Sequence, residues 1–344
     1  MENLIAYTVV DSPEHNLPGH PENPRRFQHF DRLEESPLSE QLLRIKPQVA
    51  PMSVVTAIHP PSYLTSLEQA ASRGPGFLDH GDTYVTTASY QAALEAVGGT
   101  IKVVQAVIEG QASSGFALVR PPGHHTSATR PSGFCLLNNI AIAARYAQSL
   151  GYPRVMIVDF DVHHGNGTQD IFEQDPSILY ISTHQYGIYP GTGSIHETGS
   201  GEGSGSVVNI PLPARAGDKA FEAITSELIE PITKRFQPDI LLISAGFDAH
   251  WNDPLASLQL STTGYNHLGT ALLLMAEELC EGKIVYILEG GYDPDDLWDN
   301  VLAILCSLTK GSLPVDRLGS APFPEVSIDD VIEALQTIHG IELL

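Results

Sequence analysis

The chain has 344 residues, of which 41 are acidic and 18 are basic, giving a formal net charge of −23. This charge argues against a protein that binds the nucleic-acid backbone directly, because such proteins need a basic surface to displace counterions, whereas it would attract polyamines or basic peptides. The sequence has no run of about 18 apolar residues, the length needed to cross a bilayer, so we expect no membrane contact.

The N-terminal segment predicts a first strand over residues 4–10. It has no basic stretch and carries acidic residues on both sides of the apolar run, which argues against a secretory signal. The cysteines, Cys135, Cys280 and Cys306, lie far apart, without the paired spacing of a zinc finger or a redox motif. We therefore expect buried, unreactive thiols in a cytoplasmic protein.

Short runs rich in Val, Ile and Leu recur between longer segments of helical periodicity, which predicts buried strands alternating with helices. After the first strand, further strands are expected at 115–120, 154–160, 178–183, 239–246 and 283–290. Helices are expected at 87–109, 136–150, 218–235, 263–281 and 294–308, with a terminal helix within 326–341. This order predicts an α/β fold with a mainly parallel central sheet flanked by helices, in one domain over residues 1–344. The glycine-rich segment 199–206 lacks the lysine of a phosphate-binding loop, and we interpret it as a flexible surface loop.

Polar segments directly follow the later strands. They are PPGHH after 115–120, DVHHGNG after 154–160, FDAHWNDP after 239–246 and GYD after 283–290. In a parallel sheet, ligands bind at the carboxyl ends of the strands. We therefore expect the functional site at that edge of the sheet.

Asp159, Asp161 and His163 come at the end of one expected strand, where alternation places them on one side of the chain. Carboxylates gathered there without a metal would repel one another strongly, so the pattern predicts a metal site. Catalytic zinc takes three protein ligands and keeps a further position open. Asp161 and His163 thus need a third partner, for which Asp248, after the strand at 239–246, is the natural candidate, although a carboxylate there could instead cap the following turn.

Two adjacent histidines, His124 and His125, follow the strand at 115–120. Beside a metal, such a pair can divide the proton transfers of a hydrolysis, one accepting a proton from water and the other protonating the leaving group. A carboxylate stabilises imidazolium far more than an amide does, so pairing His124 with Asp159 and His125 with Asn166 would separate their proton affinities. The residues leave open which histidine performs which transfer.

Tyr292 follows the last expected strand, after Gly290 and Gly291. The two glycines permit a tight turn that brings the phenol toward the metal, where it can donate a hydrogen bond to a developing oxyanion. The alternative is a tyrosine that only packs on the rim of the site.

Together these segments resemble the zinc-dependent histone deacetylase family, which includes acetylpolyamine amidohydrolases and bacterial deacetylase-like proteins. The resemblance rests on PPGHH…GFCLLNN, VDFDVHHGNGTQDIF, YPGTG, SAGFDAHWNDPL and EGGYD, with GHPENPRR and LDHGDTYVTTASYQAALEAVGG before them. It covers the chain from about residue 18 to about residue 310. Asn166, where class I members carry aspartate, makes the chain similar to class II.

The resemblance implies the arginase/deacetylase fold, with the active site at the carboxyl ends of the strands. It implies one Zn²⁺ per chain, held by Asp161, His163 and Asp248. It further implies that His124 and His125 form the acid–base pair, oriented by Asp159 and Asn166, and that Tyr292 polarises the acetyl carbonyl.

By the same resemblance, a narrow substrate tunnel and its mouth would be formed by Gly133, Phe134, Tyr189, Gly291 and Asp82. A potassium ion is implied near Asp159, Asp161, His163 and Ser182, and Arg26 would lie near an internal channel for acetate release.

The resulting expectation is hydrolytic removal of acetyl groups from acetyl-lysine in proteins or peptides. One alternative is deacetylation of acetylpolyamines or other small amides. Thr263 argues against it, because it aligns with the position where polyamine-selective relatives carry glutamate. A non-catalytic module that binds acetylated partners is less favoured, because every ligand and the oxyanion donor are present. A further alternative is the arginase-like chemistry of the binuclear manganese ureohydrolases. It is disfavoured, because those enzymes need bridging carboxylates where this chain has Gly165 and His250. The sequence leaves the oligomeric state open.

Overall fold

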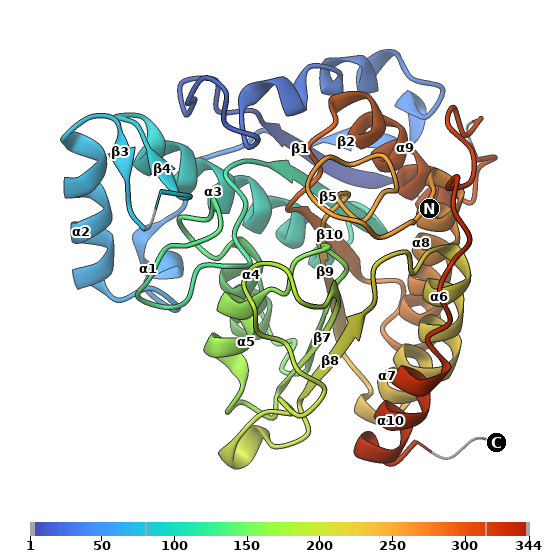
Figure 1. Ribbon diagram of the computed structural model, residues 1–344. Coiled ribbons are helices and arrows are strands. Elements are labelled where there is room, and N and C mark those ends of the chain that lie inside the picture. Colours follow the sequence, from blue (N-terminus) through green and yellow to red (C-terminus); the bar gives the residue numbers. More distant parts are fainter. Residues whose placement is uncertain (1–3, 80, 314, 342–344) are drawn as a thin grey trace.

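The centre of the protein is a parallel β-sheet. The computed structural model describes residues 4–79, 81–313 and 315–341, and within them eight strands form one sheet in the order β2-β1-β5-β10-β9-β6-β7-β8 (Figure 1). Every neighbouring pair is parallel. The strands are β1 (Ile5–Val10), β2 (Leu42–Arg44), β5 (Ser114–Val119), β6 (Val155–Asp159), β7 (Ile178–Gln185), β8 (Val207–Leu212), β9 (Ile240–Ala245) and β10 (Ile284–Leu288). The parallel α/β sheet expected from the sequence is confirmed.

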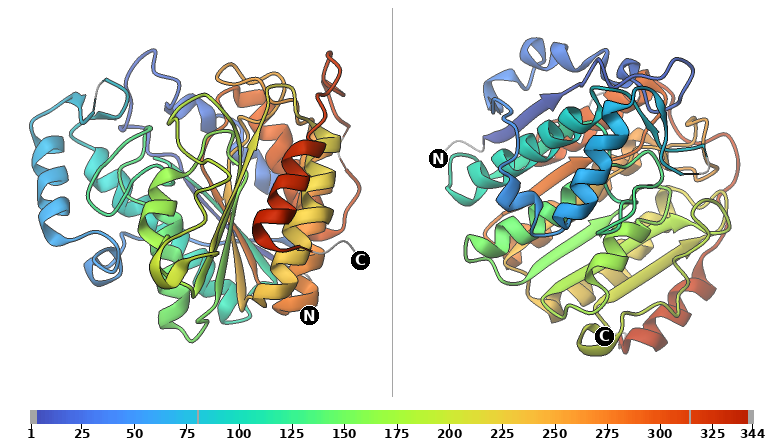
Figure 2. Two further views of the ribbon diagram at one scale, coloured as in Figure 1. Left: turned by 60° about the horizontal axis from the view of Figure 1, so that its bottom comes forward. Right: turned by 90° about the vertical axis from the view of Figure 1, so that its left-hand side faces the viewer.

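Helices cover both faces of the sheet (Figure 2). On one face lie α1 (Met52–Val55), α2 (Pro61–Ser72), α3 (Ser89–Ile108), α4 (Asn139–Ser149) and α5 (Asn166–Phe172). On the other lie α6 (Asp218–Ile224), α7 (Glu230–Phe236), α8 (Thr262–Leu279), α9 (Pro294–Thr309) and α10 (Asp329–His339). A short antiparallel pair, β3 (Gly76–Phe77) and β4 (Tyr84–Val85), stands apart from the main sheet. No helix in the described residues is both long and apolar enough to cross a membrane.

Two hydrophobic cores, one on each face, hold the layers together. In β6, Met156 and Val158 belong to the core beneath α6–α10, while Val155 and Ile157 belong to the core beneath α1–α5. Successive side chains of a strand point to opposite faces, so a strand covered on both sides needs apolar residues at every position. This explains the continuous apolar runs in the sequence.

Several elements differ from the sequence-based prediction. The short edge strand β2, the outer strand β8 and helices α2 and α5 were not predicted. The helix expected at 136–150 begins only at Asn139, because the Asn138 side chain accepts a hydrogen bond from Ala141 N and caps it there. The helix expected at 218–235 contains a π-helical turn, Thr225–Ile229, just before Pro231, which has no N–H to continue the regular pattern.

The glycine-rich segment 199–206 is a loop with a short 3₁₀ turn at Gly201–Gly203. Ser200 N donates to the carbonyl oxygen of Glu173, and Gly203 is buried. The loop is thereby anchored to the chain that follows α5. All three cysteines are free and buried.

Candidate active site

Polar side chains from four strands meet at the carboxyl edge of the sheet. His124 and His125 follow β5, Asp161 and His163 follow β6, Asp248 follows β9, and Tyr292 follows β10. Because β5, β10, β9 and β6 are consecutive in the sheet, the segments after them emerge side by side.

Asp161, His163 and Asp248 form the one group of potential metal ligands found among the described residues. Their ligand atoms all lie within 4.8 Å of one another. Nδ1 of His163 is 3.2 Å from Asp161 Oδ1 and 3.2 Å from Asp248 Oδ2. Gly290 N donates to Asp161 Oδ2 at 2.8 Å, and Val162 N donates to Asp248 Oδ1 at 2.9 Å. Both carboxylates are therefore oriented by main-chain donors.

The donor set fits a divalent zinc ion. Asp248 Oδ2 is buried and accepts no hydrogen bond of regular geometry among the described residues, although His163 Nδ1 lies 3.2 Å away. A buried carboxylate oxygen without a partner is costly, and a metal ion would satisfy it. One imidazole nitrogen and two carboxylate oxygens are ordinary ligands of catalytic zinc.

Two glycines leave room for this group. A Cβ at Gly246 would lie 2.2 Å from Asp161 Oδ2, and a Cβ at Gly290 would lie 2.2 Å from Asp248 Oδ2. Any other residue at either position would displace the carboxylate of a metal-ligand candidate. The sequence shows Gly246 and Gly290 at strand ends but does not reveal this contact.

The histidine pair lies beside the metal-ligand candidates, and its two ring centroids are 4.0 Å apart. His124 Nδ1 is 3.0 Å from Asp159 Oδ2, and His125 Nδ1 is 2.8 Å from Asn166 Oδ1. Burial opposes charge on His124, but the carboxylates of Asp159 and Asp161 outweigh it and raise the pKa of His124 to about 10. Burial lowers the pKa of His125 well below its ordinary value, and the neighbouring His124 adds to that shift. The expected pairing is present, and it separates the two proton affinities.

Of the residues expected to line a tunnel, Gly133 and Tyr189 lie against His125, and Phe134 lies against Tyr292. Gly133 (φ +54°) packs flat on the His125 ring, so that a Cβ there would come within 2.2 Å of it. Tyr189 stands edge-on to His125 with centroids 5.0 Å apart, and Phe134 stands edge-on to Tyr292 with centroids 5.9 Å apart. Tyr189 is 41% exposed, which places it where the site opens to solvent.

Tyr292 is held by its backbone and by Arg26. Tyr292 N donates to Asp253 Oδ2 at 2.7 Å. The buried Arg26 donates through Nε to the carbonyl oxygen of Gly291 at 2.7 Å and through Nη2 to that of Glu289 at 2.5 Å. Its guanidinium also lies 4.9 Å from the centroid of the Tyr292 ring. Arg26, expected near a release channel, thus braces the turn that carries Tyr292.

Of the remaining predicted residues, two lie at the edge of this cluster and one lies outside it. Asp82 is half-buried, and its carbonyl oxygen is 3.1 Å from His20 Nε2. Ser182 of β7 pairs in register with Asp159 of β6, and its Oγ is 2.9 Å from His184 Nδ1. Thr263 lies apart from the site residues and hydrogen-bonds to Asp316.

A second metal has no ligands in the positions that ureohydrolases use. A Cβ at Gly165 would lie 2.2 Å from Asp159 Oδ2 and 2.5 Å from the Tyr180 hydroxyl, so no carboxylate fits there. His250 instead has Nδ1 3.7 Å from Asp296 Oδ2. Only one group of potential metal ligands occurs in the part of the chain that the structure describes.

Glu289 is a site residue that the sequence-based prediction missed. Its buried Oε2 accepts hydrogen bonds from Gly123 N at 2.7 Å and His124 N at 3.2 Å, and its Oε1 accepts one from Ser244 Oγ at 3.1 Å. Burial raises the pKa of Glu289 to about 7. The carboxylate therefore fixes the backbone on which His124 stands. The only sequence signal was an acidic residue directly after the apolar run KIVYIL.

The comparisons with known proteins agree with this geometry. Residues 20–308 match the family described as the histone deacetylase domain. The chain belongs to the histone deacetylase family, a family of hydrolases, and it has the arginase/deacetylase fold.

Individual relatives extend over most of the chain. Histone deacetylase 10, chloroplastic, of Oryza sativa subsp. japonica is 45% identical over 315 residues, which cover 86% of this chain and 71% of that protein. Histone deacetylase 14, chloroplastic, of Arabidopsis thaliana is 42% identical, covering 97% and 84%. A probable deacetylase of Archaeoglobus fulgidus is 39% identical, covering 88% and 80%. The crystal structure of the HDA15 HD domain matches with a TM-score of 0.89 at 32% identity, covering 98% of this chain and 94% of that one.

Proposed function

We propose that the protein is a zinc-dependent amidohydrolase that removes acetyl groups from acetyl-lysine in proteins or peptides. The observation that carries this proposal is the position of His124 between two carboxylates. Its Nδ1 is 3.0 Å from Asp159, and its Nε2 is 3.8 Å from the metal-ligand candidate Asp161. A proton-transfer group and a set of metal ligands thus share one buried site, as metal-assisted hydrolysis requires.

Asp161, His163 and Asp248 would hold the zinc. When bound, zinc polarises the acetyl carbonyl and lowers the pKa of water, so that hydrolysis proceeds near neutral pH. The main-chain donors at Gly290 and Val162 keep both carboxylates oriented for this role.

The hydrogen bonds of the two histidines favour different tasks. Asn166 Oδ1 accepts from His125 Nδ1, which leaves Nε2 of the neutral ring free to take a proton from the attacking water. Asp159 stabilises the protonated form of His124. His124 would then remain positively charged beside the reacting carbonyl and support the developing negative charge. As the C–N bond breaks, His125 would pass the proton that it took from water to the leaving amine.

Tyr292 would donate its hydroxyl proton as a hydrogen bond to the oxyanion. Burial raises the pKa of Tyr292 well above its ordinary value, so the phenol stays protonated and able to donate. Arg26 and Asp253 hold the backbone that carries it. Asp82 at the mouth would accept hydrogen bonds from the substrate backbone, and a potassium ion near Asp159 and Ser182 would support the strand ends beneath the metal.

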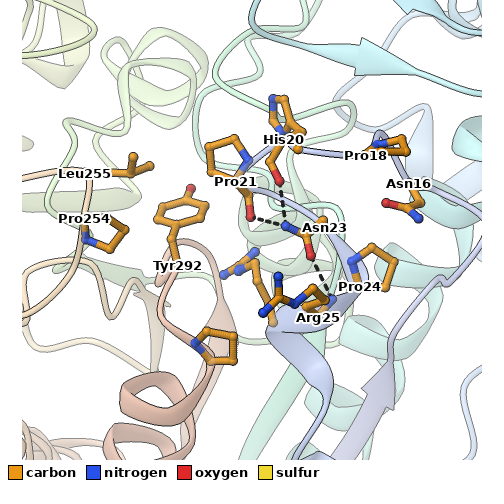
Figure 3. A pocket seen from close by; sticks show the side chains of 13 residues that line it. Asn16, Pro18, His20, Pro21, Asn23, Pro24, Arg25, Pro254, Leu255 and Tyr292 are labelled. Carbon is orange, nitrogen blue, oxygen red and sulfur yellow. Dashed lines mark hydrogen bonds between the residues drawn. The ribbon is translucent and has the colours of Figure 1, made fainter.

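Acetyl-lysine is favoured over acetylated polyamines by the charge around Tyr292. The cavity beside Tyr292 is lined by Pro254 and Leu255 on one side and by Arg25 on the other (Figure 3). Arg26 also lines it, and no carboxylate is among its lining residues. A polycation would meet positive charge there and no acidic partner. The names of the plant relatives as histone deacetylases point the same way.

Turnover by the zinc-loaded protein tests this proposal, with matched panels of acetyl-lysine peptides and acetylated polyamines. We expect peptide turnover that Asp248→Ala abolishes and that Tyr292→Phe lowers by about 10²–10³, the usual effect of losing one oxyanion donor. Preferred turnover of polyamines would move the substrate to small amines. No turnover of any acetylated amine by folded, zinc-loaded protein would favour a module that binds acetylated partners without hydrolysing them.

A further inference from the structure

A cavity of about 550 Å³ lies beside Tyr292 and opens at the protein surface. Figure 3 shows Tyr292, Pro254 and Leu255 on one side of it and the segment from Asn16 to Arg25 on the other. His20 also lines the cavity, and its ring packs edge-on to Phe134 with centroids 4.6 Å apart. The lining includes Tyr292 but none of the metal-ligand candidates. The cavity is therefore placed to hold a part of the substrate other than the acetyl group.

The charge of this cavity is opposite to that of the protein as a whole. Four other surface cavities are each lined by two or more acidic residues. The cavity beside Tyr292 has none in its lining, although the chain carries 41 acidic residues. Asp253, the nearest acidic neighbour in sequence to Pro254, is buried, and its two oxygens accept hydrogen bonds from Tyr292 N and Leu255 N.

Two guanidinium groups share one carboxylate behind the cavity. Glu22 is fully buried and accepts two hydrogen bonds from Arg120, at 2.7 Å and 2.9 Å. Arg26, which lines the cavity, lies 3.4 Å from the same carboxylate. One negative charge thus faces two positive charges, and the buried group has a net charge of +1. Buried charge is screened weakly by salt, so its field extends into the cavity.

Arg25 adds an exposed cation at the cavity wall. Its side chain has no hydrogen-bond or ion-pair partner among the described residues and points toward Tyr292 and the cavity (Figure 3). Its backbone is fixed, because Asn23 Oδ1 accepts from Arg25 N at 2.9 Å and the flanking Arg26 and Phe27 are buried. Arginine presents parallel donors that match the geometry of a carboxylate.

We propose that this cavity binds a carboxylate on the amine side of the substrate, carried by a residue next to the acetylated lysine, and that Arg25 is the residue that selects it. The apolar walls at Pro21, Pro254 and Leu255 would pack against the methylene groups of an aspartate or glutamate side chain. The enzyme would thus prefer acetyl-lysine in an acidic sequence context. This inference rests on the proposed deacetylase function and names its substrate class.

The test compares peptides that differ only in charge beside the acetyl-lysine: Glu, Gln or Lys at each of the two positions before and after it. Turnover is measured as kcat/KM with zinc-loaded enzyme, and binding is measured separately by fluorescence anisotropy. The variants are Arg25→Gln and Arg25→Glu, with Arg73→Glu as the control. Arg73 is exposed, lines none of these cavities, and its replacement changes the net charge equally.

For the wild type we expect the Glu peptide at one of these positions to exceed the Gln peptide about threefold and the Lys peptide about tenfold, mainly through KM, as expected for a partly exposed ion pair. The preference should decrease with rising salt. Arg25→Gln should remove it and Arg25→Glu should reverse it, while Arg73→Glu leaves it unchanged.

Equal use of Glu and Gln peptides by the wild type, or a preference that survives Arg25→Gln, would overturn the proposal. The proposal would also be overturned if the Arg25 variants changed only the inhibition by added acetate, because the cavity would then be a site for the acetate product. Failure of the proposed function is distinguishable, because it would appear as no turnover of any peptide. In that case the preference for Glu over Gln and Lys peptides would still be measured by fluorescence anisotropy.

Discussion

Nδ1 of His125 lies 2.8 Å from the side-chain oxygen of Asn166. A neutral amide orients the imidazole without stabilising its protonated form as a carboxylate would. Together with burial, which lowers the pKa of His125, this keeps the ring neutral and able to accept a proton. In the other histidine, His124, the corresponding Nδ1 lies beside the carboxylate of Asp159 instead of an amide.

Replacing Asn166 by aspartate should move the acidic limb of the pH profile. A carboxylate at this position raises the pKa of His125. As the pH falls, the ring is therefore protonated earlier, at a higher pH, and the neutral, active form is lost there. We expect the acidic limb of kcat/KM to shift upward by about one pH unit or more. The measurement is the pH dependence of kcat/KM for Asn166→Asp and the wild type.

Asp159→Asn provides the opposite control, since it lowers the pKa of His124. If His124 rather than His125 takes the proton from water, Asp159→Asn will move the acidic limb downward and Asn166→Asp will leave it in place. That result would reverse the two roles proposed above.

Zinc should stabilise the fold through Asp248. Its Oδ2 is buried and accepts no hydrogen bond of regular geometry among the described residues, and a bound ion would satisfy it. At free zinc about a thousandfold above Kd, binding adds about 4 kcal/mol to the free energy of unfolding. We expect thermal unfolding to shift upward with zinc in the wild type and to show no such shift in Asp248→Asn.

A suitable control for this measurement is Asp253→Asn, which changes a buried carboxylate outside the ligand group. It should retain the zinc-dependent shift. An equal zinc shift in Asp248→Asn and the wild type would exclude Asp248 as a ligand.

Glu289 should act on turnover through the backbone of His124. Glu289→Ala leaves Gly123 N and His124 N without their acceptor, which releases the segment that positions the histidine. We expect kcat to fall by about tenfold or more, because small displacements of a catalytic group are costly, with a smaller change in KM. Glu289→Gln keeps an acceptor for these donors and should retain most of the activity. Steady-state kinetics of both variants decide this, and equal activity of the Ala and Gln variants would contradict it.

His59 should make the metal-free protein less stable in acid. Its Nε2 accepts from Asn138 N at 2.9 Å and its Nδ1 donates to the carbonyl oxygen of Ala128 at 3.0 Å, so the folded state needs the neutral ring. Burial lowers its pKa from 6.5 to about 4. The resulting stability is present above pH 6.5 and is lost as the pH falls toward 4, because the unfolded state takes up the proton first.

The size of this effect is about 3 kcal/mol at most, at 1.36 kcal/mol per pKa unit. Urea unfolding in the presence of a chelator at pH 7 and pH 4.5 measures it. His59→Gln should show a smaller loss between these two pH values than the wild type. The same loss in both would mean that other buried groups account for all of the acid sensitivity.

The long, fully buried strands were predictable because burial on both faces demands an uninterrupted apolar run, as in β6 and β9. β2 was not predicted because it is short and only partly buried, and β8 was not predicted because Pro211 interrupts its apolar pattern. Helix α5 starts with Asn166 and Gly167, residues that otherwise signal a turn. The tertiary setting overrode local preference in these places.

The same limit applies to the site. Asp161 and His163 are two residues apart, and a histidine pair needs no fold to be noticed. The contact of Glu289 with Gly123 spans 166 residues and exists only because β5 and β10 are neighbours in the sheet. Arg26 meets Gly291 across 265 residues in the same way. Strand order, on which both contacts depend, is not written in local sequence.

β10 is the last strand of the sheet to be synthesised, yet it lies between β5 and β9. β10 is the strand that joins β5 to β9. Until residues 284–288 leave the ribosome, β5, which precedes the histidines, therefore has no link to the strands that precede Asp161, His163 and Asp248. A nascent chain that stops before Ile284 therefore contains both histidines and all three metal-ligand candidates but lacks the strand that joins β5 to β9. During translation, the histidine pair therefore joins the metal-ligand candidates only when β10 closes the sheet.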